Sequence, residues 1–150
     1  MSVDEVAHLA RRTGRWVLDS IRGRGDESVA TAVLLPAELE LWRGMQPQDR
    51  AHSLRVLSRF MVLRPSAPET ELRGVLLHDV GKSIVLLGLA SRIAATILGP
   101  RRPRWRDYLD HERIGSDLLR AAGSHEETWR MVLGEGDPEA LHALRRADDE

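Results

Sequence analysis

The sequence predicts an all-α bundle of about seven helices, and three observations support this fold class. Apolar residues recur at helical spacing through most of the chain. Proline and glycine stand where helices would begin and end, as at Pro36, Gly44, Pro47 and Gly123. No stretch alternates apolar and polar residues with the period of two that is typical of a half-buried strand.

In the N-terminal half, caps and prolines set the limits of the predicted helices. Ser2 and Glu5 form a capping box for the first helix, which ends before the glycine-rich turn Arg22–Glu27. Proline at the first position begins the next two helices, and a pair of prolines brackets the turn before the fourth. In chain order, these helices are expected at residues 7–21, 36–42, 47–63 and 69–79.

In the C-terminal half, glycine and proline separate a further set of helices. Residues 99–103 interrupt an apolar run, Gly123 ends one helix, and Gly134–Pro138 leads into the last. These helices are expected at residues 83–98, 104–122, 124–133 and 139–148. We interpret residues 1–46 as an N-terminal helical segment packed on the core and residues 47–150 as the main domain of a single globular unit.

Length and composition restrict the possible functions. A chain of 150 residues is typical of one domain. It contains no cysteine, so any metal ion would be held by imidazole, carboxylate and water. That ligand set suits Mn, Fe, Mg, Ni, Co or Zn, and the sequence does not choose among them. The net charge of −1, with both signs well mixed, argues against a general nucleic-acid binder.

The sequence indicates a cytoplasmic protein without a membrane partner. Residues 1–6 lack the basic region and apolar core of a signal peptide. The apolar run Ile84–Leu98 is interrupted by Arg92 and is short for a bilayer, so we expect a buried helix there. The oligomeric state stays open.

The pair His78-Asp79 is the most informative feature of the chain. Asp79 occupies position i+7 of a helical stripe that otherwise faces a core. The rest of the stripe consists of Leu72, Val75 and Leu76. A buried carboxylate needs a partner, and a metal ion is one of the few that can hold it there. His78 adds a nitrogen ligand from the same short stretch of backbone, so the pattern predicts a metal-centred protein.

Two further candidate ligands fall where helix packing would bring them to this pair. His52 lies near the start of helix 47–63, and a short connection makes this helix an antiparallel neighbour of helix 69–79. The start of one helix then lies beside the end of the other. In the last helix, Asp148 continues the apolar stripe, whereas Asp149 continues a polar face, so the pattern selects Asp148.

The order His52, His78-Asp79, Asp148 resembles the His … His-Asp … Asp motif of the HD-domain superfamily. The matching pieces are Asp49–Leu54, Leu76–Lys82, Asp110–Gly123 and Ala143–Asp149. The third piece is similar to the His-Pro-x-x-Gly segment of HD phosphohydrolases. Residues 47–150 would therefore form the HD domain, and the chain resembles small actinobacterial HD-domain proteins regarded as metal-dependent phosphohydrolases.

The resemblance implies a site for one divalent metal ion that activates a water to attack a small phosphate ester or nucleotide. The implied metal ligands are His52, His78, Asp79 and Asp148. Asp79 would also belong to the catalytic residues, together with two others. Lys82 would contact a phosphate oxygen. His111 would support a ligand or the substrate, or hold a second ion.

One departure from the family pattern keeps alternatives open. HD proteins with a segment like that of His111 usually carry a further histidine before the final aspartate, but residues 127–138 contain none. The Gly-Tyr-Pro signature of one branch is also absent. The alternative is a catalytically impaired HD module that binds a nucleotide or a protein partner as a sensor or scaffold. A helical interaction domain without a metal is the third possibility.

Overall fold

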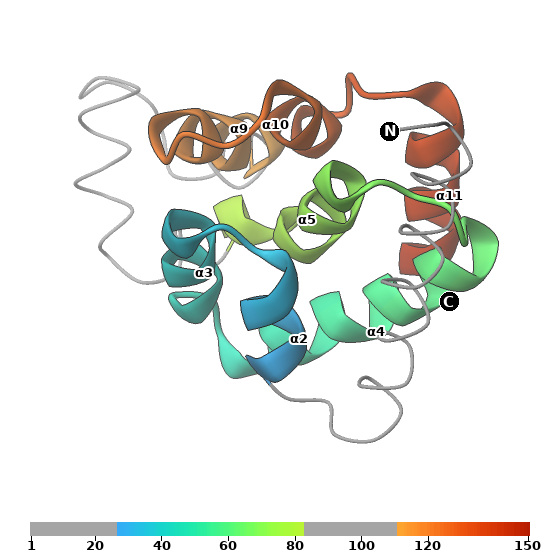
Figure 1. Cartoon of the computed structure of the whole chain (residues 1–150), viewed down its shortest axis with the longest axis horizontal. Coiled ribbons are helices and arrows are strands. Elements are labelled where there is room, and N and C mark those ends of the chain that lie inside the picture. The colour runs from blue at the N-terminus through green and yellow to red at the C-terminus, as the bar shows by residue number, and fades with distance from the viewer. Residues whose placement is uncertain (1–26, 83–110) are drawn as a thin grey trace, which may run out of the picture.

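The computed structural model describes residues 27–82 and 111–150, and this part of the chain is all-helical (Figure 1). It contains seven helices and no strand, which confirms the predicted fold class. The helices are α2 (Glu27–Val33), α3 (Pro36–Arg43), α4 (Pro47–Leu63), α5 (Glu69–Leu77), α9 (His111–Ala121), α10 (Glu126–Leu133) and α11 (Pro138–Asp149). The predicted helices 7–21 and 83–98, the break at 99–103 and residues 104–110 lie outside the described residues. No helix in the described part is both long and apolar enough to cross a bilayer.

Prolines set the starts of three helices, two of them as the sequence predicts and the third, at Pro138, one residue before the expected start. Pro36, Pro47 and Pro138 each lie in the first turn of a helix, where the missing N–H removes no intrahelical hydrogen bond. Among the described residues, the glycines with positive φ are Gly123 at 80° and Gly134 at 83°, and they follow the ends of α9 and α10. A glycine adopts this left-handed conformation without a Cβ clash, so it ends a helix at little cost.

Two predicted helix limits differ by two residues from those of the structure. Helix α5 ends at Leu77, and His78 and Asp79 form a turn before the chain becomes helical again at Val80. The expected helix 69–79 is therefore shorter at its C-terminal end. Helix α10 begins at Glu126, after the expected start at residue 124.

Helix α2 is not among the elements that the sequence predicts, and Glu27, which we assigned to a turn, is its first residue. Val29, Ala30 and Val33 are buried, and α2 packs against α3 and α5. Valine has a modest helix propensity, and a helix this short is marginal by itself. Tertiary packing therefore forms α2, which explains why local pattern does not reveal it.

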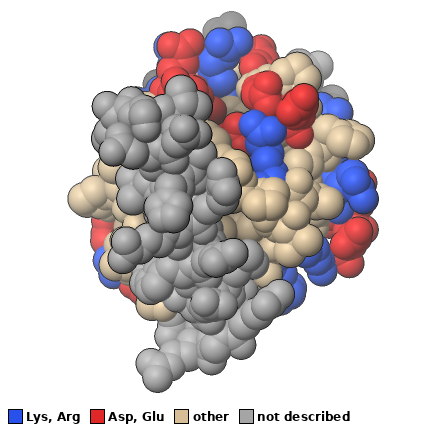
Figure 2. Space-filling view, turned by 45° about the vertical axis from the view of Figure 1, so that its right-hand side comes forward, with Lys and Arg blue, Asp and Glu red and all other residues tan. Residues whose placement is uncertain are grey.

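Helix α5 lies at the centre of the bundle, between α4 on one side and the pair α9–α10 on the other (Figure 1). Most of the largest fully buried side chains come from these elements, among them Phe60, Leu57, Leu76 and Leu119. Helix α11 packs along α4. On the face turned forward in Figure 2, acidic and basic side chains are interspersed over the described surface.

Arg64, the residue that follows α4, ties the end of this helix to the starts of two others. Its guanidinium donates to both carboxylate oxygens of Glu71 in α5, at 2.6 and 2.8 Å. It also lies 3.3 Å from Asp137, the N-cap of α11. Helix α4 therefore runs antiparallel to both α5 and α11. The start of α4 accordingly lies beside the end of α5 and the end of α11.

Candidate metal centre

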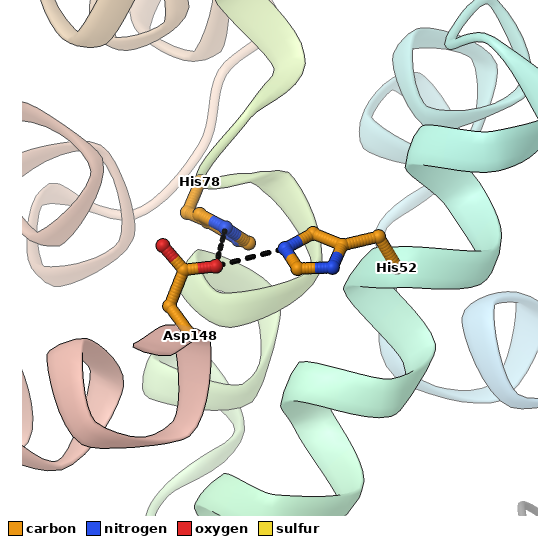
Figure 3. Close-up of side chains that lie close together, drawn as sticks. All are labelled: His52, His78 and Asp148. Carbon is orange, nitrogen blue, oxygen red and sulfur yellow. Dashed lines mark hydrogen bonds and ion pairs between the residues drawn. The ribbon is translucent and has the colours of Figure 1, made fainter. Parts of the chain in front are cut away.

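Three side chains that are far apart in the sequence meet at this end of the bundle (Figure 3). His52 comes from the early part of α4, His78 from the turn after α5, and Asp148 from the end of α11. Each offers one ligand atom, and these atoms all lie within 4.8 Å of one another. In residues 27–82 and 111–150, this is the one group of three or more such side chains that could hold a metal ion.

The spacing of the donor atoms is close to that of ligands around one ion. Oδ1 of Asp148 lies 2.8 Å from Nε2 of His52 and 3.5 Å from Nε2 of His78. The two imidazole rings have their centroids 5.9 Å apart. Ligand atoms that bind one ion at about 2.1 Å are separated by about 3.0–3.4 Å in tetrahedral or octahedral geometry. Small side-chain movements would therefore bring the three groups into one coordination sphere.

The hydrogen bonding of His78 fixes its tautomer. Nδ1 lies 2.7 Å from the carbonyl oxygen of Val75, and because a carbonyl only accepts, Nδ1 carries the proton. In the neutral ring, the lone pair is then on Nε2. That atom is buried and makes no hydrogen bond to the described residues, and carboxylate oxygens of Asp79 and Asp148 lie 3.5 Å from it. A ligating histidine usually donates its other ring N–H to a carbonyl or carboxylate in this way, so the environment of His78 fits a metal ligand.

The charges around His78 and Asp148 favour a cation. His78 lowers the pKa of Asp148 well below its ordinary value, and His52 acts in the same direction, whereas partial burial opposes them. Burial lowers the pKa of His78, but the carboxylates of Asp148 and Asp79 and the carbonyl of Val75 raise it more strongly. Asp148 is thus a carboxylate at neutral pH, and the surroundings of His78 stabilise positive charge.

Asp79 lies beside the cluster but is not one of its three members. Its side chain is only 10% exposed, and its two oxygens face different groups. Oδ2 lies 3.5 Å from Nε2 of His78, whereas Oδ1 lies 2.9 Å from Nζ of Lys82 and 4.0 Å from Nε2 of His111. Lys82 therefore gives this buried carboxylate a charged partner within the chain. Asp79 connects the histidine cluster to Lys82 and His111.

The access to the cluster is one-sided. The side chains of His78 and Asp79 are each 10% exposed, whereas those of His52 and Asp148 are 32% and 40% exposed. The centre is therefore buried on the side of His78 and Asp79 and reaches solvent at His52 and Asp148. A pocket of about 430 Å³ lies elsewhere, near the start of α5 and the loop between α10 and α11. It is at the opposite end of α5 from His78.

Two of the segments that carry the family resemblance contact each other directly. A Cβ at Gly81 would lie 1.9 Å from the carbonyl oxygen of His111 and 2.9 Å from the backbone nitrogen of Gly115. Only glycine at position 81 permits this backbone contact. The turn that carries His78 and Asp79 thus packs against the start of α9, which is how His111 reaches Asp79.

Arg59 is a residue near the site that the sequence analysis does not single out. Its Nη1 donates to the carbonyl oxygen of Ala147, the residue before Asp148, at 3.0 Å. Arg59 follows His52 by two helical turns on the same face of α4, and this spacing could have identified it from the sequence.

The remaining described histidines, His125 and His142, are exposed and lie outside the cluster.

Searches against protein-family models, curated proteins and solved structures found no match to this chain.

Proposed function

We propose that this protein is a metal-dependent phosphohydrolase of the HD type, acting on a nucleotide or another small phosphate ester. The observation that carries the proposal is the convergence of His52, His78 and Asp148, whose ligand atoms lie within 4.8 Å of one another. Asp79, beside His78, is the proposed fourth ligand. The ion is one of Mn, Fe, Mg, Ni, Co and Zn.

The roles of the residues follow from their positions. A divalent ion held here would lower the pKa of a bound water and neutralise negative charge on phosphoryl oxygens. His52 and Asp148 are the more exposed members of the centre, so the substrate approaches from their side. Lys82, whose side chain is 35% exposed, orients Asp79 and places a positive charge beside the site. His111 faces the same oxygen of Asp79 as Lys82 does and would contact the substrate or its leaving group.

The alternative is an HD module that binds a nucleotide or a protein partner without turning it over. The exposed positions of His125 and His142 favour it, because these side chains do not add ligands to the described cluster. If His78 binds the first ion, His111 is the imidazole among the described residues that lies near Asp79 to bind a second ion. Thermal stabilisation by a nucleotide without formation of product would support this alternative over hydrolysis.

The proposal is tested by phosphate release. Protein loaded in turn with each of the six ions is incubated with a panel of nucleotides and phosphomonoesters. We expect turnover with at least one ion, and we expect Asp148→Asn to reduce it at least about 100-fold because a ligand is lost. The matched control is Asp149→Asn, which changes an exposed neighbour and should leave turnover within about twofold. No turnover with any ion, or equal losses in the two variants, would contradict the proposed activity.

A further inference from the structure

The position of Asp148 depends on how the C-terminal end of α11 is held. Helix α11 ends at Asp149, so Asp148 lies in its last turn. The last carbonyl groups of a helix have no intrahelical N–H partner, so a side chain of a neighbouring helix can donate to them. A metal ligand in such a turn is useful only when its carboxylate is kept in place.

Arg59 supplies a contact at this helix end. Its guanidinium donates to the carbonyl oxygen of Ala147 at 3.0 Å, and Ala147 itself is fully buried. Side chains of a helix lean toward its N-terminus, so Arg59 extends back along α4 in the direction of His52. A positive charge beside the C-terminal carbonyls also interacts favourably with the helix dipole.

A second arginine, just after the end of α4, holds the other end of α11. Arg64 lies 3.3 Å from Asp137, the N-cap of α11, and 3.5 Å from Glu139 in its first turn. Helix α11 is thus fixed to α4 at both ends, by Arg64 at its start and by Arg59 at its finish. The side chain of Asp148, 2.8 Å from His52, lies just beyond the second of these contacts.

We propose that Arg59 is a positioning residue, which holds the last turn of α11 and thereby places the carboxylate of Asp148 between His52 and His78. This inference rests on the proposed metal centre. Arg59 does not contact the ion or the substrate in this proposal, and it acts through the backbone of Ala147.

The test compares the metal affinity and the helix-end protection of arginine variants. Arg59→Met keeps most of the apolar stem but removes the donor, so we expect it to fold and to bind the metal at least about tenfold more weakly. Arg59→Lys retains a donor and should recover most of the affinity. The control is Arg55→Ala, an exposed position one turn earlier on α4, which should bind like the wild type. The probes are Mn²⁺, Fe²⁺, Mg²⁺, Ni²⁺, Co²⁺ and Zn²⁺, each added alone.

Hydrogen exchange in metal-free protein provides a readout that does not depend on the ion. In Arg59→Met, the amides of the last turn of α11 should exchange at least about tenfold faster than in Arg55→Ala, while those of α5 stay unchanged. If the wild type binds metal and Arg59→Met binds it with the same affinity, the inference about Arg59 is wrong and the proposed function is unaffected. A wild type that binds none of the six ions would overturn the proposed function, and the inference with it.

Discussion

Replacing Gly81 with alanine is expected to destabilise the protein by about 3 kcal/mol, near the upper end for overpacked sites. The new Cβ would lie 1.9 Å from the carbonyl oxygen of His111 and 2.9 Å from the nitrogen of Gly115. Both are backbone atoms, so rotation of a side chain does not relieve the contact. The start of α9 must move away, and it takes His111 away from Asp79. Denaturant unfolding measures the loss of stability.

Gly44→Ala is the matched control for this substitution. Gly44 is exposed, its φ is −71°, and the nearest atom to a Cβ there is the carbonyl oxygen of Leu41 at 3.3 Å. We expect a change within about 0.5 kcal/mol, because this φ suits any residue and the contact with Leu41 requires a shift of only a few tenths of an ångström. Equal stabilities of Gly44→Ala and Gly81→Ala would show that the backbone contact of residue 81 is not required.

Glu38→Ala is expected to cost a similar amount, about 3 kcal/mol, because it removes a paired carboxylate from the interior. The Glu38 side chain is 0% exposed. It accepts hydrogen bonds from the backbone nitrogen of Leu35 at 2.9 Å and from Oγ of Ser124 at 2.7 Å, and it faces Nε of Arg73 at 3.9 Å. Its loss leaves both donors without this acceptor and opens a cavity between α3, α5 and the α9–α10 connection. Thermal and denaturant unfolding report the effect.

Two other variants in α3 serve as comparisons for Glu38→Ala. Glu40→Ala removes a carboxylate that is 71% exposed and paired with Arg43, so it should change stability by less than about 0.5 kcal/mol. Glu38→Gln keeps an acceptor for Leu35 and should fall between the two, at about 1 kcal/mol. A Glu38→Ala protein as stable as Glu40→Ala would mean that the buried carboxylate does not hold α3 to its neighbours.

The sequence predicts a helix correctly where nearby residues, such as a proline at its start and apolar residues at helical spacing, set its limits. Helix α4 has its expected limits because proline at position 47 begins it and its buried apolar face continues to Met61, close to its last residue. Helix α2 could not be predicted, since burial of its valines against α3 and α5 forms it. Likewise, the sequence gives no local sign that Glu38 is buried and Glu40 exposed, because Ser124, a partner of Glu38, is distant in the chain.

In the candidate site, too, contacts set by nearby residues were predictable, whereas contacts that depend on long-range packing were not. The meeting of His52 with His78 was predictable, because the short connection between α4 and α5 makes these helices antiparallel. Asp148 could be chosen over Asp149 as the candidate ligand because it continues the apolar stripe of α11. The pairing of Asp79 with Lys82 and the contact of Arg59 with Ala147 were not predicted. The first depends on the turn that replaces the end of the expected helix, and the second on long-range packing of α11 on α4.

The central claim is that His52, His78 and Asp148 bind one divalent ion, and metal content tests it most directly. Protein purified without chelator is dialysed against each of the six ions, and bound metal is measured by elemental analysis. We expect one ion per chain in the wild type and in His142→Asn, which changes an exposed histidine of α11, and little or none in His52→Asn. A wild type that retains none of the six ions, or a His52→Asn variant that retains as much as His142→Asn, would contradict it.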